Sequence, residues 1–158
     1  MSELLLTYRG AVYPWHCDHV GHMNVMWYVG KFDEATWNLF AMGGITPAYL
    51  REQHRGMAAV QQNIAYKREL KAGDVLVIRS GVLEVREKLI RFCHEMRNAV
   101  TDEVSAITVV TGIHMDTDAR KGCPLPEELA TRVRTLITSY APPEELLSSL
   151  RSGTKPQG

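Results

Sequence analysis

The sequence predicts an α+β fold in which a curved antiparallel five-stranded sheet wraps around one long buried helix. Residues 25–42 have the spacing of a helix that is apolar over much of its circumference. One strand-like stretch precedes this helix and four follow it with short turns, an order that favours mainly antiparallel pairing. The chain has 158 residues, of which 45% are apolar, and this suffices for one hydrophobic core.

The first strand is expected over residues 4–13, where apolar side chains recur at alternate positions before Pro14 removes a ladder donor. In the helix that follows, the 3.6-residue period is carried by Tyr28, Phe32, Ala35 and Leu39. Gly43 ends the helical pattern. Gly30 lies inside it at a cost of about 1 kcal/mol relative to Ala, so we expect another backbone to approach closely there.

Four further strands are predicted at residues 58–70, 75–86, 89–98 and 104–115. A short helix is predicted over residues 127–140, and we treat residues 1–140 as a single domain. Residues 141–158 are rich in Pro, Gly and Ser and are interpreted as a largely flexible C-terminal extension. Because an open sheet leaves exposed edges, we expect a homodimer, or a tetramer of two dimers.

The composition argues against several classes of protein. Lys and Arg number 18, as do Asp and Glu, so there is no basic excess for a nucleic-acid partner. No apolar run approaches the ~20 residues that span a bilayer, so no membrane partner is expected. Three widely spaced cysteines give no disulfide framework, which favours a reducing, cytoplasmic location.

The most distinctive segment is the polar run from His16 to Asn24, directly before the apolar helix. A helix N-terminus presents unpaired N–H groups that can stabilise a carbonyl oxygen as it gains negative charge. Asp18 lies within this run, and a carboxylate beside such a site can act as a nucleophile or as a general base toward water. The residues therefore indicate hydrolysis by acyl transfer.

The same run contains three histidines that invite comparison with a zinc site, namely His16, His19 and His22. These histidines lie before the predicted helix, and even on a helix their spacing would spread them around its axis. No Cys-x-x-Cys pair accompanies them. We therefore predict that the protein uses no metal and no other cofactor.

The stretch from Trp15 to Asn24, with Tyr28, resembles the signature of acyl-CoA thioesterases of the 4-hydroxybenzoyl-CoA thioesterase type, which have the hotdog fold. That signature has an Asp, two further residues, then Gly-His-Met/Val-Asn and a Tyr four residues on. The resemblance implies that an acyl-CoA is hydrolysed to a carboxylic acid and CoA. The residues from His22 to Tyr28 are also similar to subgroups that act on small or quaternary-ammonium acyl-CoAs, such as betainyl-CoA.

The resemblance also implies roles for individual residues. Asp18 matches the nucleophile or general base, and Val25 matches the residue whose backbone N–H polarises the thioester carbonyl. Substrate-binding roles are implied for His22, Asn24 and Tyr28. His16 stands where the signature commonly has another Asp, so a role for that acid is not carried over. We expect the pocket to lie at a subunit interface.

Simpler structural explanations exist for the same side chains. Asp18 can close an Asx turn, Asn24 can cap the helix, His22 can brace the loop and Tyr28 can pack in the core. His94 is interpreted as a hydrogen-bonded sheet histidine. Trp27 and Trp37 are expected in the core. For Trp15, packing in the core is favoured over stacking on the substrate.

Two classes of function therefore remain. The first is the thioesterase; the alternative is a non-hydrolytic hotdog module that binds an acyl thioester or assembles a complex. Asp18 favours the first, because a binding module has no use for a carboxylate at the carbonyl. The CoA phosphates would need basic partners, for which the candidates are Lys67, Arg68, Arg86, Lys88, Arg91, Arg120 and Lys121.

Overall fold

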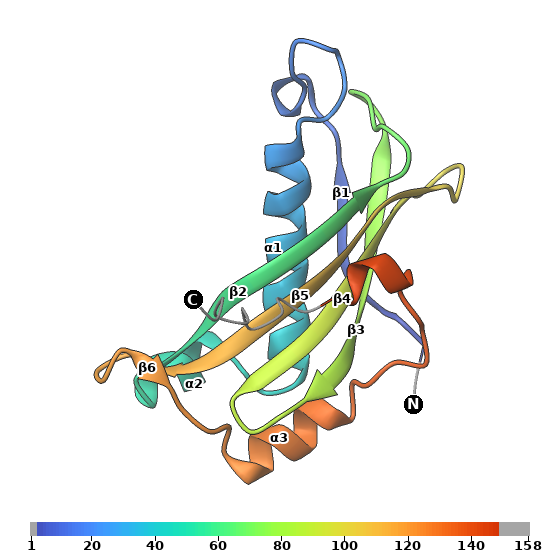
Figure 1. The fold of residues 1–158 in the computed structure, drawn as a ribbon. Coiled ribbons are helices and arrows are strands. Elements are labelled where there is room, and N and C mark those ends of the chain that lie inside the picture. The colour runs from blue at the N-terminus through green and yellow to red at the C-terminus, as the bar shows by residue number, and fades with distance from the viewer. Residues whose placement is uncertain (1–2, 149–158) are drawn as a thin grey trace, which may run out of the picture.

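The computed structural model describes residues 3–148. Its elements follow in the order β1 (Leu5–Ala11), a 3₁₀ turn (Pro14–His16), α1 (Val25–Met42), α2 (Pro47–Glu52), β2 (Arg55–Tyr66), β3 (Val75–Val85), β4 (Leu89–Asn98), β5 (Val104–Asp116), β6 (Lys121–Gly122), α3 (Glu127–Arg134) and a 3₁₀ turn (Glu144–Leu146). Figure 1 shows this arrangement.

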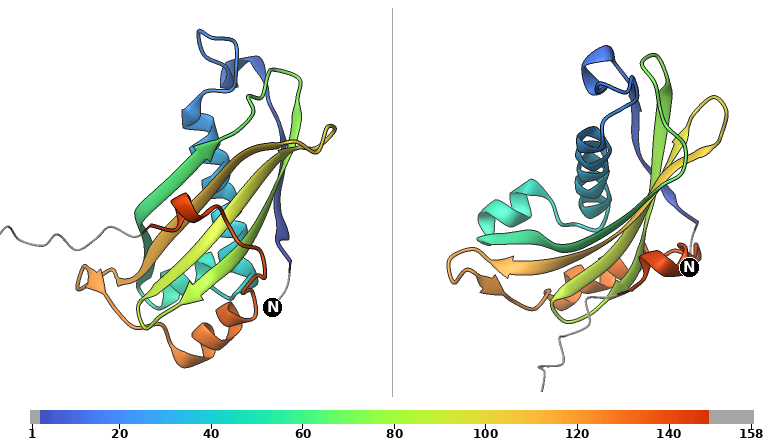
Figure 2. Two further views of the ribbon diagram at one scale, coloured as in Figure 1. Left: turned by 45° about the vertical axis from the view of Figure 1, so that its right-hand side comes forward. Right: turned by 45° about the horizontal axis from the view of Figure 1, so that its top comes forward.

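The five long strands form one antiparallel sheet in the order β1-β3-β4-β5-β2, and the two-residue β6 pairs with β5. The sheet curls, and α1 lies along its concave face (Figures 1 and 2). The predicted architecture of a curved antiparallel sheet around one long helix is therefore confirmed. The short α2, which sequence periodicity did not reveal, leads from α1 into the edge strand β2.

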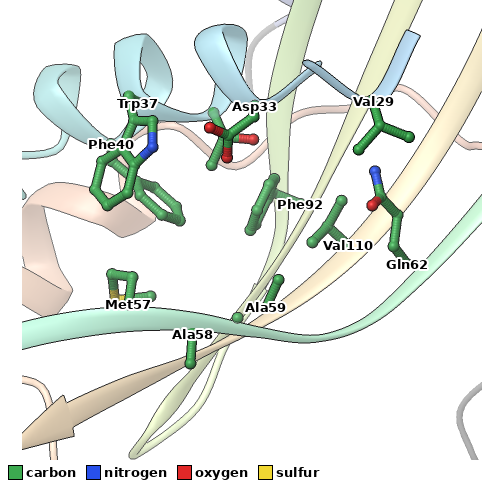
Figure 3. A pocket seen from close by; sticks show the side chains of 12 residues that line it. Val29, Asp33, Trp37, Phe40, Met57, Ala58, Ala59, Gln62, Phe92 and Val110 are labelled. Carbon is green, nitrogen blue, oxygen red and sulfur yellow. The ribbon is translucent and has the colours of Figure 1, made fainter. Parts of the chain in front are cut away.

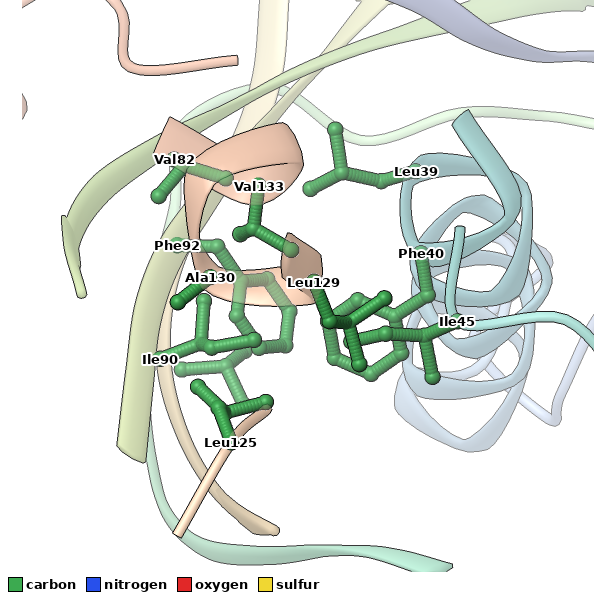
Figure 4. Close-up of a cluster of buried hydrophobic side chains, with 11 residues drawn as sticks. Leu39, Phe40, Ile45, Val82, Ile90, Phe92, Leu125, Leu129, Ala130 and Val133 are labelled. Atoms are coloured by element: carbon green, nitrogen blue, oxygen red, sulfur yellow. The ribbon is translucent and has the colours of Figure 1, made fainter. Parts of the chain in front are cut away.

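Two apolar clusters hold α1 in the concavity. Near its N-terminal half, Tyr28 and Phe32 pack with Ile78 and Met96 of the sheet. Near its C-terminal half, the core continues to α3 (Figure 4), through Leu39, Phe40, Ile45, Val82, Ile90, Phe92, Leu125, Leu129, Ala130 and Val133. Burying one large apolar side chain of this kind contributes roughly 1.5–3 kcal/mol.

The sheet covers one side of α1, and part of the apolar surface of the helix is exposed. Val25, Val29 and Trp37 are exposed on the side that faces away from the core. The expectation for Gly30 is wrong: apart from its chain neighbours and the backbone of its own helix, no atom within residues 3–148 lies within 4 Å of the place a Cβ would take. The apolar pattern of the helix thus includes a surface that this chain leaves uncovered.

The helix predicted over residues 127–140 ends early, at Arg134. The chain turns there because the next residues bond to β3: Val82 N–H donates to Leu136 O at 3.0 Å, and Thr138 N–H donates to Val82 O at 2.9 Å. These bonds bring the chain to the convex face of the sheet.

Part of the expected C-terminal extension is described, over residues 141–148, and it crosses the convex face (Figure 2). Leu146 is buried there against Cys93, Ile107 and Val109. The Asn63 side-chain amide donates to the Leu146 carbonyl at 2.9 Å. Leu146 and Leu147 therefore pack on the sheet. The remainder of the extension lies outside the described residues, and the division of the chain at residue 140 stays a prediction.

A buried polar network joins α1 to the sheet. His94 on β4 is fully buried, its Nε2 lies 2.8 Å from Thr36 Oγ1 of α1, and its Nδ1 is bonded to Ser80 Oγ. The interpretation of His94 as a hydrogen-bonded sheet histidine is confirmed. Burial lowers the pKa of His94 to about 3.

This depressed pKa predicts a pH-dependent loss of stability. Because the folded protein holds His94 neutral, its contribution is full above the unfolded pKa of about 6.5 and is lost as the pH falls toward about 3. Between pH 7.5 and 5 the free energy of unfolding should fall by about 2 kcal/mol on this account. Urea unfolding at both pH values should show that fall in the wild type and a smaller one in His94→Gln. Equal falls in the two proteins would contradict this origin.

Candidate active site

A tight turn positions Asp18 in front of α1. Cys17 and Met23 form an antiparallel bridge, and Asp18 N–H donates to His22 O at 3.1 Å. Gly21 N–H donates to Asp18 O at 3.0 Å and closes the turn. Gly21 has a φ of +86°, a conformation that glycine adopts without steric cost. The short loop between β1 and α1 is thereby fixed by its own backbone.

The Asp18 carboxylate accepts two hydrogen bonds from this loop. Oδ1 accepts from Val20 N–H at 2.9 Å, and Oδ2 accepts from Asn24 Nδ2 at 3.0 Å. The Val20 N–H first, and then the Asn24 amide, hold the pKa of Asp18 below its ordinary value. The Asx-turn interpretation is therefore confirmed, and it is compatible with catalysis because each carboxylate oxygen keeps further acceptor capacity.

Asn24 connects this carboxylate to the start of α1. Its Oδ1 accepts from Met26 N–H at 2.9 Å, so its interpretation as the helix N-cap is confirmed. Within residues 3–148 no acceptor takes the Val25 N–H, and Val25 is exposed. One amide side chain thus holds an ionised carboxylate beside a helix N-terminus whose first N–H remains open to a ligand.

A surface groove of about 370 Å³ contains this arrangement. It is lined by Asp18, Val20, His22, Met23, Val25 and Tyr28 on one side and by Tyr66, Lys67, Arg68 and Glu69 on the other. The structure therefore brings four of the five predicted site residues into one groove, and the fifth, Asn24, binds Asp18. Of the basic residues considered for the CoA phosphates, only Lys67 and Arg68 line it.

Tyr28 takes part in the core as well as in this groove. It is buried, its hydroxyl lies 3.3 Å from Ser105 Oγ, and its ring meets Tyr66 edge to face. Its role in packing is therefore plain, whereas its contact with substrate stays a prediction. His22 lines the groove half-buried.

A second hollow continues along the same side of α1, between α1 and β2, with a volume of about 90 Å³. Val29 of this hollow lies one helical turn beyond Val25, and Gln62 lies four residues before Tyr66 on β2. Figure 3 shows its main walls, Val29, Asp33, Trp37, Phe40, Met57, Ala58, Ala59, Gln62, Phe92 and Val110. We call the two hollows together the α1–β2 cleft.

The cleft overturns one expectation, because Trp37 is 39% exposed at its edge instead of buried in the core. Asp33 supplies a carboxylate to the same hollow. Residues 3–148 contain no group of three His, Cys, Asp or Glu side chains placed to share a metal ion. In the described part of the chain, no helix has the length and apolar character needed to cross a membrane.

A family model described as the thioesterase-like superfamily matches residues 12–133. The chain belongs to this superfamily. The predicted class of protein, a thioester hydrolase with the hotdog fold, is therefore confirmed.

Individual relatives are more distant. A betainyl-CoA thioesterase from Pseudomonas aeruginosa is 23% identical over 140 residues, which cover 89% of this chain and 88% of the relative. An L-carnitine dehydrogenase/betainyl-CoA thioesterase from Rhizobium meliloti is 27% identical over 124 residues, or 78% of this chain. The matched region spans only 25% of the length of that relative.

Solved structures agree in fold. A Staphylococcus aureus protein in complex with CoA superimposes with a TM-score of 0.83 at 16% identity, covering 95% of this chain and 97% of that one. A 1,4-dihydroxy-2-naphthoyl-CoA thioesterase from Synechocystis gives a TM-score of 0.73 at 17% identity, covering 83% and 96%.

The double role of Asn24 leads to a prediction. Asn24→Ala should lower the free energy of unfolding by about 1 kcal/mol, as loss of a helix N-cap does. It should also raise the pKa of Asp18, because the carboxylate loses its Asn24 hydrogen bond. Urea unfolding and an NMR titration of the Asp18 carboxyl carbon measure the two effects.

The matched control is Thr46→Ala, which removes the N-cap of α2, where Thr46 Oγ1 accepts from Tyr49 N–H at 3.1 Å. This variant should lose similar stability and leave the pKa of Asp18 unchanged. If the Asn24→Ala protein titrates Asp18 as the wild type does, the amide does not control the carboxylate.

Proposed function

We propose that this protein hydrolyses an acyl-CoA thioester to a carboxylic acid and CoA, with Asp18 as nucleophile or general base and Val25 as the oxyanion donor. One observation carries the proposal: Asn24 holds the ionised Asp18 carboxylate beside the open Val25 N–H. A carbonyl bound to that N–H would present its carbon to the carboxylate. Its oxygen would gain negative charge where the helix supplies partial positive charge.

Two balanced routes use this geometry. As a general base, Asp18 takes a proton from water while the water oxygen attacks the thioester carbon; the C–S bond then breaks, and the CoA sulfur leaves with the proton. As a nucleophile, an Asp18 oxygen attacks the carbon and displaces CoA thiolate, which is then protonated. Water hydrolyses the resulting anhydride and restores the carboxylate. The Val25 N–H stabilises the oxyanion in both routes.

The catalytic role of Asp18 can be tested by replacing it with Asn, which has the same shape and no charge. Asp18→Asn should lower kcat by about 10²- to 10⁴-fold, the range for loss of a general base, and should leave KM nearly unchanged. CoA release from the best acyl-CoA of a panel, followed with a thiol reagent, measures both constants. Retention of near wild-type turnover in folded Asp18→Asn protein would exclude both routes.

The matched control is Asp74→Asn, since Asp74 Oδ2 accepts from Lys71 N–H at 2.8 Å in a similar turn contact away from the groove. This variant should keep full activity. The alternative function, a non-hydrolytic acyl-thioester-binding module, would instead appear as acyl-CoA binding without CoA release by the wild type.

We further propose that the active unit is a homodimer joined at β2. This 12-residue strand pairs only with β5 among the described residues, and its Val60 side chain is 53% exposed. A long uncovered edge beside the exposed Val29 and Trp37 of α1 favours pairing with another copy.

Antiparallel pairing of two such edges about their middle would bring Tyr66 of one protomer near Met57 of the partner subunit. The Asp18 groove of one subunit would then open into the Asp33 hollow of the other. Val25 and Asp33 of one chain are separated by eight helical residues, about 12 Å along α1 at 1.5 Å per residue. A short acyl group bound at Val25 would not span this distance within one chain, which supports a pocket completed by the partner subunit.

The dimer can be tested by placing charge on the edge. Val60→Lys should shift the mass in size exclusion with light scattering from at least twice 17.8 kDa toward a single chain of 17.8 kDa. Leu6→Lys, which places the same charge at an exposed position of β1, should not. A wild type that is already a monomer at micromolar concentration would contradict the proposal.

The walls of the Asp33 hollow favour a short acyl group that carries positive charge. Trp37, Phe40 and Phe92 present aromatic rings, and Asp33 adds a carboxylate. Aromatic faces with a carboxylate attract quaternary ammonium groups. The betainyl-CoA thioesterases among the relatives support a substrate of this kind.

This substrate class makes Asp33 a determinant of specificity. Asp33→Asn should reduce the preference in kcat/KM for betainyl-CoA over 3,3-dimethylbutyryl-CoA, its uncharged isostere, by about 5- to 30-fold. Glu128→Gln, which changes an exposed carboxylate on α3, should leave the preference unchanged. An equal loss of kcat/KM on both substrates would show that Asp33 does not recognise the positive charge.

A further inference from the structure

A separate hollow of about 470 Å³ lies on the other side of α1, between α1 and β1. Its main walls are Tyr8, Tyr13, Trp15, Trp27, Lys31 and Glu34. None of these residues lines the α1–β2 cleft, and the proposed hydrolysis uses none of them. We call it the α1–β1 hollow.

Aromatic rings form much of its wall. Tyr13 and Trp15 are 50% and 66% exposed, and their rings stack on each other with centroids 4.5 Å apart. The Trp27 ring lies deeper, against the buried His16. Gly30 adds no side chain, which keeps this side of the helix open. Rings held open to solvent in this way present electron-rich faces to a ligand.

Two opposite charges accompany the rings. The Lys31 side chain is buried, with the residue only 4% exposed, and its Nζ donates to Tyr8 Oη at 3.2 Å and to Ala11 O at 3.5 Å. Among residues 3–148 no carboxylate lies within ion-pair distance of this ammonium. Two of its three N–H donors are thus used, Nζ also lies 5.4 Å from the centroid of the Tyr8 ring, and Lys31 lines the hollow. Glu34 is exposed at the same hollow. The pKa of the Tyr8 hydroxyl is raised, first by burial and second by the negative charge of Glu34.

The buried His16 adds a further donor. Its Nδ1 accepts from Tyr13 N–H at 2.9 Å, so a neutral His16 carries its proton on Nε2. The hollow therefore combines aromatic faces and a carboxylate, which suit an organic cation, with an ammonium and an imidazole N–H, which suit a carboxylate.

We propose that the α1–β1 hollow binds a small zwitterion that carries a quaternary ammonium and a carboxylate. The ammonium lies against the aromatic rings near Glu34, and the carboxylate binds Lys31. A simple cation is attracted by Glu34 but repelled by Lys31, and a simple anion the reverse, whereas a ligand with both charges is attracted by both groups. The site does not require the hydrolysis proposed above; if betainyl-CoA is the substrate, its free acid product is such a zwitterion.

Calorimetric titration of the full chain tests the proposal without turnover. The probe is trimethylammonioacetate, and its two controls lack one charge each: choline lacks the carboxylate, and 3,3-dimethylbutyrate lacks the ammonium. The protein carries Asp33→Asn, which weakens cation binding in the α1–β2 cleft. The zwitterion should bind at least about fivefold more tightly than either control.

Variants on this background locate the site. Trp15→Ala, at an exposed position where folding is not at risk, and Glu34→Gln should each weaken zwitterion binding about 5- to 30-fold. Lys31→Met should abolish the preference for the zwitterion over choline. Glu128→Gln, which removes an exposed carboxylate on α3 away from both sides of α1, should change none of these affinities.

Several outcomes would overturn the proposal. One is that the Asp33→Asn protein does not bind the zwitterion. Another is that Trp15→Ala and Glu34→Gln leave its binding intact. A third is that the protein with native Lys31 binds the zwitterion and choline equally well. A fall in oligomer mass on Trp15→Ala, seen by light scattering, would assign the hollow to a contact between subunits instead.

Discussion

The seating of α1 in the concave face of the sheet is the constraint on which the rest of the molecule depends. Tyr28, Phe32 and Leu39 fix its rotation about its axis, and the Thr36–His94 hydrogen bond fixes it along that axis. Because rotation and translation are both set, the N-terminus of α1 and the Asp18 turn before it lie opposite Tyr66 to Glu69 across the groove. The remaining sides of α1 then face two different hollows, one toward β2 and one toward β1.

The parts of the site that were predictable from sequence are those encoded within a few residues. Asp18, Gly21 and Asn24 lie within one turn, and each has a residue type that suits its backbone position. The opposite wall, Tyr66 to Glu69, was considered only for its basic residues. It comes some forty residues later, at the end of β2, and it meets the groove only because β2 is the edge strand beside α1. Local spacing carries no information about that edge.

The tryptophans show a second limit. An apolar side chain has the same sequence pattern whether it packs in the core or lies exposed, where a ligand or another subunit can cover it. The sequence pattern therefore favours the core for Trp37 and for Trp15, yet both are exposed. Exposed large apolar groups that gather beside a hollow indicate an interaction surface, which only the fold can reveal.

The segment that crosses the convex face determines how larger assemblies can be built. Leu146 fills the place against Cys93 and Val109 that a neighbouring sheet would otherwise take, and the Asn63 amide anchors its backbone. Stacked sheets approach to about 10 Å, a spacing that leaves no room for an intervening chain. Over this region the sheet cannot stack back to back with another. If the proposed dimer assembles further, it would therefore do so through other surfaces, with this segment facing outward.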